Sequence, residues 1–485
     1  MVTFCIALLM LIAGYLLYGK VAERIIKPDS KAQTPAYAKN DGVDYIPMPT
    51  WKIFMIQFLN IAGLGPIFGA VLGAMFGTAS YIWIVFGCIF IGAVHDYTSG
   101  MLSLRHDGEN LPEIIGRYLG GTTKLIMRIF TIILMVMVAA VFVSGPAAIL
   151  DSITPESLNA NFWIIVIFVY YVVATLLPID KIIGKVYPIF AIALIFMALG
   201  ILVMLFTGQY HIPEITEGIA NTHPNANNLP IFPIMCVTIA CGAISGFHAT
   251  QSPLMARCLK NEDLGRKVFY GSMILEGIMA LIWAAAAIWY YQNYGYGENN
   301  AAKIVNFITN TWMGRLGALL ALLGVVFAPI TSGDTALRSC RLIVADFMKK
   351  DQKKISNRLL IAVPLFVATA GVIIYSLADS EGFNLIWRYF AWCNQTLSVF
   401  TLWAVTVYLV INNKKWIITF VPALFMTLVC ATYLFVAPEC INIDTLLAPK
   451  GTVNPGHTIG YIIGGVIAAA FAVGFFVWKS KRISK

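Results

Sequence analysis

The sequence predicts an all-α polytopic membrane protein that crosses the lipid bilayer about thirteen times, because apolar runs of about 20 residues recur along the chain. Of the 485 residues, 59% are hydrophobic and only 12% are charged, whereas a soluble domain carries about 25% charged residues. Two of the apolar runs carry glycine and polar residues at their centres, which is typical of the interrupted helices of secondary transporters. We therefore expect those two helices to form the functional site.

The first apolar run, 2–19, has no basic n-region and no small-residue cleavage motif, so we expect a retained span rather than a cleaved signal. The other expected spans, each accurate to a few residues, are 52–76, 80–103, 123–146, 161–179, 187–207, 231–255, 268–292, 313–333, 358–378, 387–412, 415–437 and 457–478. The segments 28–50 and 208–230 are expected to be loops, since both contain several prolines and polar residues.

Loops rich in Lys and Arg alternate with loops that are poor in them. The basic loops are 104–128, 180–186, 256–267, 334–358, the turn at Lys414 and Lys415, and the C-terminal tail, whereas 151–160 and 208–230 have no basic residue. By the positive-inside rule the basic loops are cytoplasmic, which places the N-terminus outside and the C-terminus inside. These loops account for the net charge of +9, so the charge does not indicate binding to nucleic acid.

The first unusual span carries Asn60, Gly63, Gly65 and Pro66 at its centre, between Phe58 and Ala70. Within a helix, glycine costs about 1 kcal/mol and proline about 3 kcal/mol relative to alanine. Proline also removes a backbone hydrogen bond. We expect this helix to be broken near the middle of the membrane, where unpaired backbone groups are tolerated if they line a cavity or are buried in protein. The alternative is a kinked packing helix, because glycine is common in membrane helices.

The second unusual span, 236–253, also places small and polar residues at its centre: Gly242, Ser245, Gly246 and His248. A break is expected at 244–246. An odd number of spans, five, separates the starts of the two unusual helices, so they enter the membrane from opposite sides. This is typical of an inverted repeat.

The spacing predicts a LeuT-type fold with a 5+5 inverted repeat and three extra helices. The first five-helix repeat covers 52–207, and the second covers 208–412 with its preceding outer loop. The segment 1–51 supplies a leading helix and a cytoplasmic loop. The segment 413–485 supplies two additional helices and the basic tail.

The gap between the two broken helices is the predicted substrate site. Free N–H groups at the start of a half-helix favour anions, so we expect a small carboxylate such as a keto acid or the carboxylate end of an amino acid or peptide. The candidate substrate contacts are Asn60, Ala62, Gly63, Gly65, Gly242, Ser245, Gly246 and His248.

A short motif in the eighth core span suggests a cation site. LeuT-type sodium symporters carry Ala-x-x-Thr-Ser there, and this chain has Ala328, Thr331 and Ser332. With carbonyl groups of Ala62 and Gly65 they would bind Na⁺. Alternatively, the two hydroxyls bond to carbonyls of the preceding turn. The cysteines show no metal-binding spacing, so no other metal or cofactor is expected.

Carboxylates within the predicted spans are candidates for ion coupling, since charges at membrane depth are costly. Asp96 could instead pair with Arg105. Glu276 could carry a proton or hold another helix by a hydrogen bond. Asp334 lies one turn before Arg338, and a structural pair is favoured there.

Two further polar groups of residues have different expected roles. His248 can donate a hydrogen bond and can titrate near neutral pH, which suits a site role. Asn394, Gln395 and Thr396 form a polar cluster in the tenth core span, and we expect helix-to-helix contacts from it.

Several runs resemble the carbon starvation protein A (CstA) family: Gly65-Pro-Ile-Phe-Gly-Ala70, Gly92-Ala-Val-His-Asp96, Ile239-Ala-Cys-Gly-Ala-Ile-Ser-Gly-Phe-His248, Tyr270-Gly-Ser-Met-Ile-Leu-Glu276 and the segment from Asp334 to Arg338. The resemblance covers roughly 50–350. It implies a bacterial inner-membrane transporter related to the amino acid–polyamine–organocation superfamily, with peptide uptake or proton-coupled pyruvate uptake as the activity. It also implies roles for Asp96, His248, Glu276 and Asp334.

One stretch departs from the family pattern. The family usually continues after His248 with a Ser-Gly-Thr-Thr-Pro-type run, whereas this chain reads Ala-Thr-Gln-Ser-Pro-Leu. The substrate therefore stays open between pyruvate and short peptides.

The leading hypothesis is a transporter that imports a small carboxylated nutrient with H⁺ or Na⁺ by alternating access, with the lipid bilayer and the small molecule as its partners. The alternatives are an amino acid symporter and a nutrient-binding membrane sensor without net transport. A membrane enzyme is not expected, because the chain has no paired histidines, Walker motif or GxGxxG motif. The sequence does not determine the oligomeric state.

Overall fold

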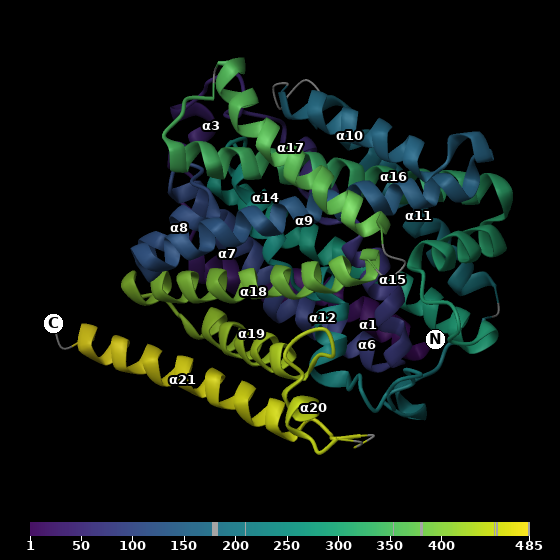
Figure 1. The fold of residues 1–485 in the computed structure, drawn as a ribbon. Coiled ribbons are helices and arrows are strands. Elements are labelled where there is room, and N and C mark those ends of the chain that lie inside the picture. Colours follow the sequence, from purple (N-terminus) through teal and green to yellow (C-terminus); the bar gives the residue numbers. More distant parts are fainter. Residues whose placement is uncertain are drawn as a thin grey trace.

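The computed structural model describes residues 1–176, 183–208, 210–352, 354–378, 382–450, 452 and 454–483, and its regular elements there are all helices. Long helices cross the molecule in Figure 1, and the two termini lie at opposite ends of it. The predicted all-α architecture is confirmed. Residues 177–182 lie outside the described part, so the end of the predicted span 161–179 and the start of the loop 180–186 are not tested.

The first repeat starts with a broken span, as predicted. It comprises α4 (Thr50–Ile61), a π-helical turn (Gly65–Gly69), α5 (Ala70–Gly73) and a final turn (Ala74–Phe76), and its two halves are bent by 52°. The next span combines α6 (Ala79–Ile82), a π-helical stretch (Trp83–Gly92) and α7 (Ala93–Arg105). The unit continues with α8 (Leu111–Leu119), which lies in the following loop, and with α9 (Gly121–Ile153), α10 (Ala160–Leu176) and α11 (Ile183–Thr207).

The second repeat also starts with a broken span. It comprises a π-helical turn (Ile231–Met235), α12 (Cys236–Thr238), α13 (Ala240–Ala243) and α14 (Gly246–Ala256). Ile244 and Ser245 separate α13 from α14 in an extended conformation, with φ of −162° and −144°, so the predicted break at 244–246 is confirmed. The rest of the repeat is α15 (Gly271–Tyr294), α16 (Ala301–Met348), α17 (Ile355–Ala378) and α18 (Gly382–Ile411).

Helix α16 is longer than the predicted span 313–333. Gly314 interrupts it with a φ of 65°, which glycine adopts without strain, and this interruption coincides with the predicted start. The predicted end was wrong: the helix continues to Met348. The reason is packing, since Leu337, Cys340 and Ile343 stay buried beyond residue 333.

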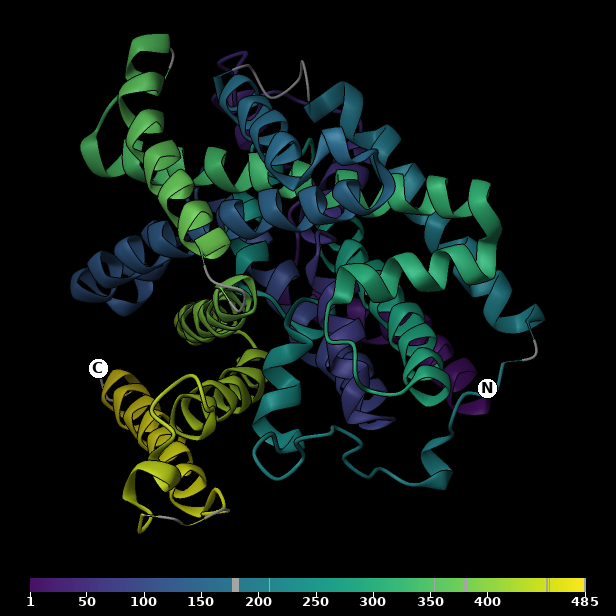
Figure 2. The same ribbon diagram turned by 45° about the vertical axis from the view of Figure 1, so that its right-hand side comes forward.

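The remaining helices lie outside the repeat. They are α1 (Val2–Ala13), joined to α2 (Gly19–Ile26) by a π-helical turn (Gly14–Tyr18), the short α3 (Pro35–Ala38) and α20 (Ile443–Leu447), and the long α19 (Ile417–Val436) and α21 (Thr458–Ile483). Helix α19 packs against α18, and α21 packs against α19 at the lower edge of Figure 2.

The length and hydropathy of the described helices support most of the predicted spans. Ten helices are long and apolar enough to cross a membrane, and the bent pair at 50–76 makes eleven. The two other predicted spans correspond to a shorter apolar helix, Ala160–Ala174, and to the segmented helix at 231–256. The total of thirteen stays a prediction.

The two broken spans cross each other in close contact. A methyl group added at Gly65 would lie 2.2 Å from Sγ of Cys241, and one added at Gly69 would lie 2.9 Å from the carbonyl oxygen of Thr238. Real side chains do not approach this closely. Glycine is therefore required on the first span for the backbones to meet at this depth.

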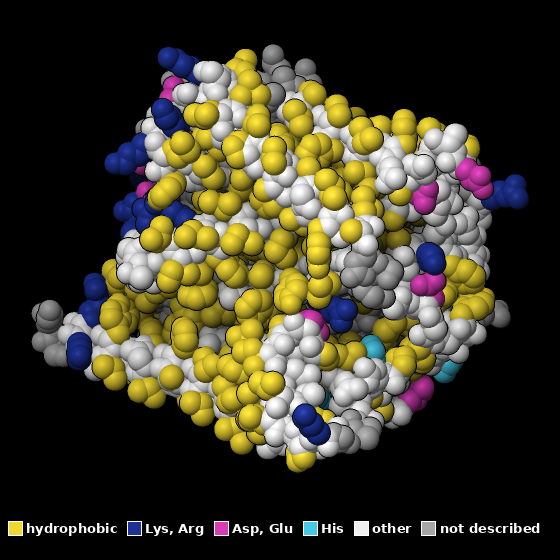
Figure 3. Space-filling view, viewed as in Figure 1, with side chains coloured by type: hydrophobic (Ala, Val, Ile, Leu, Met, Phe, Trp, Pro, Cys, Tyr) yellow, Lys and Arg dark blue, Asp and Glu magenta, His cyan; other side chains and the backbone are white. Residues whose placement is uncertain are grey.

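Basic side chains gather on one end of the molecule. Figure 3 shows Lys and Arg along its left edge, at the end where α3, α8 and the C-terminus lie, while apolar side chains cover the middle of this face. This distribution agrees with a membrane-embedded bundle whose basic loops share one side.

The loop at 28–50 folds back against the basic end of the bundle. Its Asp44 is buried, and the carboxylate lies 3.3 Å from Nη1 of Arg338. Burial raises the pKa of Asp44, but Arg338, Arg341 and Arg257 lower it more, and the net pKa is below its ordinary value. The loop is thus fixed to the eighth core helix by an ion pair that no local sequence pattern indicated.

We expect Gly65→Ala to lower the melting temperature of the detergent-solubilised protein, because overpacking a well-packed core costs about 1–3 kcal/mol. Adding Cys241→Gly should restore part of the loss, since it removes the side chain that the new methyl group meets. Cys241→Gly alone is the reference. Equal melting temperatures for Gly65→Ala and wild type would contradict the crossing described above.

Candidate functional site

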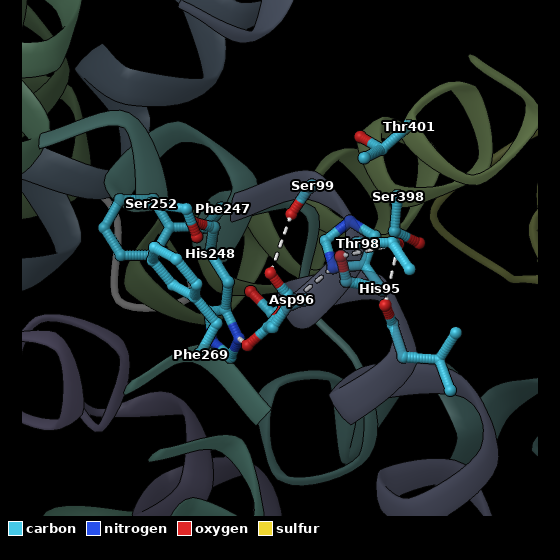
Figure 4. Close-up of polar contacts among 12 residues, drawn as sticks. His95, Asp96, Thr98, Ser99, Phe247, His248, Ser252, Phe269, Ser398 and Thr401 are labelled. Carbon is cyan, nitrogen blue, oxygen red and sulfur yellow. Dashed lines mark hydrogen bonds and ion pairs between the residues drawn. The ribbon is translucent and has the colours of Figure 1, made fainter. Parts of the chain in front are cut away.

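Asp96 lies between two histidines in the interior of the bundle. Its Oδ1 is 2.8 Å from Nδ1 of the neighbouring His95, and its Oδ2 is 2.8 Å from Nδ1 of His248. Figure 4 shows the carboxylate between the two rings, one on α7 and the other on α14. All three side chains are fully buried. A carboxylate only accepts hydrogen bonds, so each Nδ1 must carry the hydrogen.

Glu276 of α15 extends this cluster on the far side of His248. Its Oε2 lies 3.4 Å from Nε2 of His248, and no hydrogen bond joins them. Glu276 is fully buried, and neither of its carboxyl oxygens has a hydrogen-bond partner among the described residues. The structure therefore brings together three of the predicted site residues, Asp96, His248 and Glu276, from three helices.

The geometry requires a proton between His248 and Glu276. If the Nδ1 hydrogen of His248 points to Asp96, a deprotonated Nε2 and an ionised Glu276 would place two acceptors 3.4 Å apart. One proton on either atom removes this repulsion. With that proton the group formed by Asp96, His248 and Glu276 carries one net negative charge, and a second proton would neutralise it. Burying an unpaired charge is costly, so this cluster is suited to binding and releasing protons.

Arg105 does not pair with Asp96, so the alternative role considered for Asp96 is wrong. The Nη2 atom of Arg105 lies 2.8 Å from Oε2 of Glu262, and Nη1 donates to the hydroxyl of Tyr408. The reason is that Arg105 sits at the end of α7, more than two helical turns beyond Asp96, beside the loop that carries Glu262.

Asp334 is bound to a tyrosine of the first repeat. Its Oδ2 accepts a hydrogen bond of 2.6 Å from the hydroxyl of Tyr187 on α11. Arg338, the expected partner of Asp334, forms its described ion pair with Asp44 and donates to the carbonyl oxygen of Ala174. The ion-coupling role predicted for Asp334 stays a prediction.

Asn394 fixes the second break. Its Oδ1 accepts hydrogen bonds from the hydroxyl of Ser245, at 3.0 Å, and from the backbone N–H of Phe247, at 2.7 Å. The start of α14 is thus capped by protein, which differs from the open anion site expected for Ser245. The helix-to-helix role predicted for Asn394 is what the structure shows, and Gln395 does the same by donating to the carbonyl oxygen of Cys236.

Gly242 and Gly246 lie where neighbouring helices come close. A methyl group at Gly242 would be 2.4 Å from Cβ of Ala280, and one at Gly246 would be 2.3 Å from the carbonyl oxygen of Asn394. These positions contact α15 and α18. Their predicted role as substrate contacts gains no support from this packing.

Two amides on the first broken span have no hydrogen-bond partner among the described residues. Asn60 and Gln57 are fully buried one helical turn apart, and neither amide forms a hydrogen bond with the described residues. Buried polar side chains are usually satisfied, so such groups are candidates for ligand contacts. Gln57 was missed from the sequence, although its i, i+3 spacing to Asn60 could have indicated it. The chain bends directly after them, at Ala62 and Gly63.

The predicted cation motif lies beside the first break. The hydroxyl of Ser332 is 3.1 Å from the carbonyl oxygen of Leu59 and 2.9 Å from that of Ala328. Thr331 donates to carbonyls of its own preceding turn, at Ala328 and Phe327. The motif thus meets α4, but through Leu59 rather than through the predicted carbonyls of Ala62 and Gly65. A Na⁺ site stays a prediction.

Comparison with known proteins gives a consistent family match. The family model for carbon starvation protein CstA matches residues 1–154, 150–311 and 298–433. The peptide transporter CstA of Campylobacter jejuni is 26% identical over 85% of this chain and 76% of its own length. The pyruvate/proton symporter BtsT of Escherichia coli is 29% identical, over 56% of this chain and 46% of its own. An uncharacterised Haemophilus influenzae membrane protein is 41% identical over 60% of this chain and 91% of its own length. Several relatives match over about half of their own length.

Solved structures share the fold at low sequence identity. A manganese transporter from Eremococcus coleocola has a TM-score of 0.56 and 12% identity, over 92% of this chain and 99% of its own. MhsT in complex with L-phenylalanine has a TM-score of 0.56 and 13% identity, over 81% of this chain and 97% of its own. These matches confirm the predicted LeuT-type fold.

We expect Asn394→Ala to destabilise the protein, because the buried Phe247 N–H and the Ser245 hydroxyl hydrogen lose their acceptor, at about 1–3 kcal/mol each. Thermal unfolding in detergent measures the loss. Asn310→Ala, at an exposed amide of α16, is the control and should have little effect. Equal melting temperatures for the two variants would contradict the capping role of Asn394.

Proposed function

The chain belongs to the carbon starvation protein CstA family, and we propose that it is a secondary active transporter that imports pyruvate or a short peptide together with protons by alternating access. The names of its relatives supply the substrate class, since pyruvate and peptides both carry a carboxylate. The carrying observation is the buried cluster of Asp96, His248 and Glu276.

The cluster joins the two halves of the inverted repeat. Asp96 is on α7 of the first repeat, and His248 and Glu276 are on α14 and α15 of the second. A hydrogen bond to a charged group is roughly twice as strong as one between neutral groups. A proton on His248 therefore strengthens its bond to Asp96, and loss of the proton weakens the link between the repeats. Proton binding can bias one conformation over another in this way.

We propose that the substrate carboxylate binds next to the first break. The amides of Gln57 and Asn60 supply N–H donors there that have no partner in the described part of the chain. Helix α4, which carries them, packs against α14 and α15, the helices of His248 and Glu276. A carboxylate bound at these amides would lie in the same helical layer as the proton-binding cluster, so that each ligand influences the other.

The sodium alternative rests on Ala328, Thr331 and Ser332. The hydroxyls of Thr331 and Ser332 already donate to backbone carbonyls, which is ordinary for Ser and Thr in membrane helices. The titratable cluster favours protons as the coupling ion. We place the protein in the bacterial inner membrane, with the basic end of the bundle toward the cytoplasm.

Purified protein in proteoliposomes tests the proposal. We expect an inward proton gradient to drive uptake of radiolabelled pyruvate or dipeptide, whereas a sodium gradient at equal pH should not. One pH unit can drive about tenfold accumulation per coupled proton, because a tenfold ratio corresponds to about 1.4 kcal/mol. Uptake driven only by a sodium gradient would contradict proton coupling and would indicate a Na⁺ site at Thr331 and Ser332. Binding without flux would support a sensor instead.

We expect Glu276→Gln to abolish proton-driven accumulation while exchange of labelled for unlabelled substrate continues, because the amide removes the proton-binding carboxyl and keeps its shape. Glu156→Gln, at an exposed position in a loop, is the matched control and should keep both activities. Retention of full accumulation by Glu276→Gln would exclude Glu276 from coupling.

A further inference from the structure

A large apolar groove lies between the repeat and the extra helices. It has a volume of about 1210 Å³, and its walls come from α2, the π-helical stretch Trp83–Gly92, the start of the second broken span and α19. Tyr18, Phe86, Phe90, Ile417, Val421 and Phe425 line it. The groove is therefore formed where helices outside the repeat meet a span of the first repeat.

The walls of the groove face outward. Phe86 is 47% exposed, Val421 57% and Ile417 60%. The wall on α19, from Ile417 to Phe425, is about 12 Å long at 1.5 Å per residue. This is close to half of the hydrocarbon thickness of about 30 Å, which is the depth that an acyl chain of one leaflet reaches. The shape and chemistry of the groove suit a lipid chain.

One end of the groove is basic. Lys414 and Lys415, in the turn between α18 and α19, line it together with Trp416. The ammonium group of Lys414 donates to the carbonyl oxygen of Ile26. In the described part of the chain neither lysine forms an ion pair with a carboxylate, and Glu262, whose charge acts on Lys414, is paired with Arg105.

The environment of Lys414 favours an anion beside it. Burial and the positive charge of Arg105 lower the pKa of Lys414 to about 8; Glu262 opposes this shift, and Lys27 adds to it. A phosphate at this point would offset the repulsion. Trp416 next to it, with Nζ of Lys479 4.1 Å from its ring centre, is the kind of residue that marks a membrane interface. The basic end therefore lies at headgroup level.

We propose that this groove binds one anionic phospholipid, with its phosphate at Lys414 and Lys415 and an acyl chain along Phe86, Phe90 and Val421. Basic pockets between membrane helices on the cytoplasmic side bind such headgroups. The apolar channel ends at two lysines that have no carboxylate partner among the described residues. This combination selects an anionic lipid over a zwitterionic one and over an apolar protein surface.

The bound lipid contacts the helix that supports the second break. A methyl group added at Gly87 would lie 2.8 Å from Cβ of Ala243, and one added at Gly92 would lie 2.2 Å from its carbonyl oxygen. Ala243 is the last helical residue before the break, and Gly87 also lines the groove. A lipid in the groove therefore supports the stretch that holds the broken helix in position. We expect the lipid composition to change the thermal stability of the protein as well as the amount of lipid bound.

Native mass spectrometry of delipidated protein with added phosphatidylglycerol or phosphatidylcholine tests the proposal. We expect wild-type protein to retain one phosphatidylglycerol at least tenfold more than phosphatidylcholine, and to melt at a higher temperature when phosphatidylglycerol is present. The variant Lys414→Gln/Lys415→Gln should lose the preference and the shift. The control variant Lys349→Gln/Lys350→Gln changes an exposed lysine pair outside the groove and should keep both.

A second variant tests the groove independently, in case Lys414→Gln/Lys415→Gln does not fold. Val421→Trp fills the groove from its exposed wall and leaves both lysines in place, so it should reduce retention of either lipid. Equal retention of the two lipids by wild type, or an unchanged preference in Lys414→Gln/Lys415→Gln, would overturn the proposal. A dimer that resists dissociation and excludes lipid would also overturn it, because the groove would then bind a second copy of the chain.

Discussion

The close crossing of the two interrupted helices at Gly65 and Cys241 positions the rest of the candidate site. The absence of a side chain at Gly65 lets the backbones meet at the depth where each helix is broken. A break inside a membrane leaves backbone groups without their usual partners, and these must be satisfied by protein. Asn394 does this at the second break by accepting from the N–H of Phe247. At the first break, the hydroxyl of Ser332 donates to the carbonyl oxygen of Leu59.

The charged cluster depends on this arrangement. Asp96 and His248 are 152 residues apart in the sequence, and they meet because α7 packs against α14. Removing either partner would leave a buried charge or polar group uncompensated, so the pair also stabilises the contact between the repeats. Glu276 differs from Asp96 because its carboxyl lacks hydrogen-bond partners among the described residues. One carboxylate is therefore held firmly, and the other is left available for a proton.

The helices outside the repeat have a separate role in the architecture. α2 and α19 do not contribute to the charged cluster, but they cover the side of the π-helical stretch Trp83–Gly92 and create a concave surface there. The same stretch packs against the helix before the second break. The extra helices thus place the lipid environment one layer of residues away from the interrupted span.

The sequence by itself determined the features that have local causes. Apolar length predicted the spans, and runs of small and polar residues, such as those around Gly65 and Ser245, predicted both breaks. Counting the spans predicted that the two broken helices have opposite polarity. Tertiary structure alone decided the partners, because these depend on which faces of distant helices meet: Arg105 pairs with Glu262 rather than with Asp96, and the amide of Gln57 is buried beside the first break. Hydropathy and spacing place a helix in the membrane, but they do not fix its rotation about its own axis, and that rotation decides which polar groups meet.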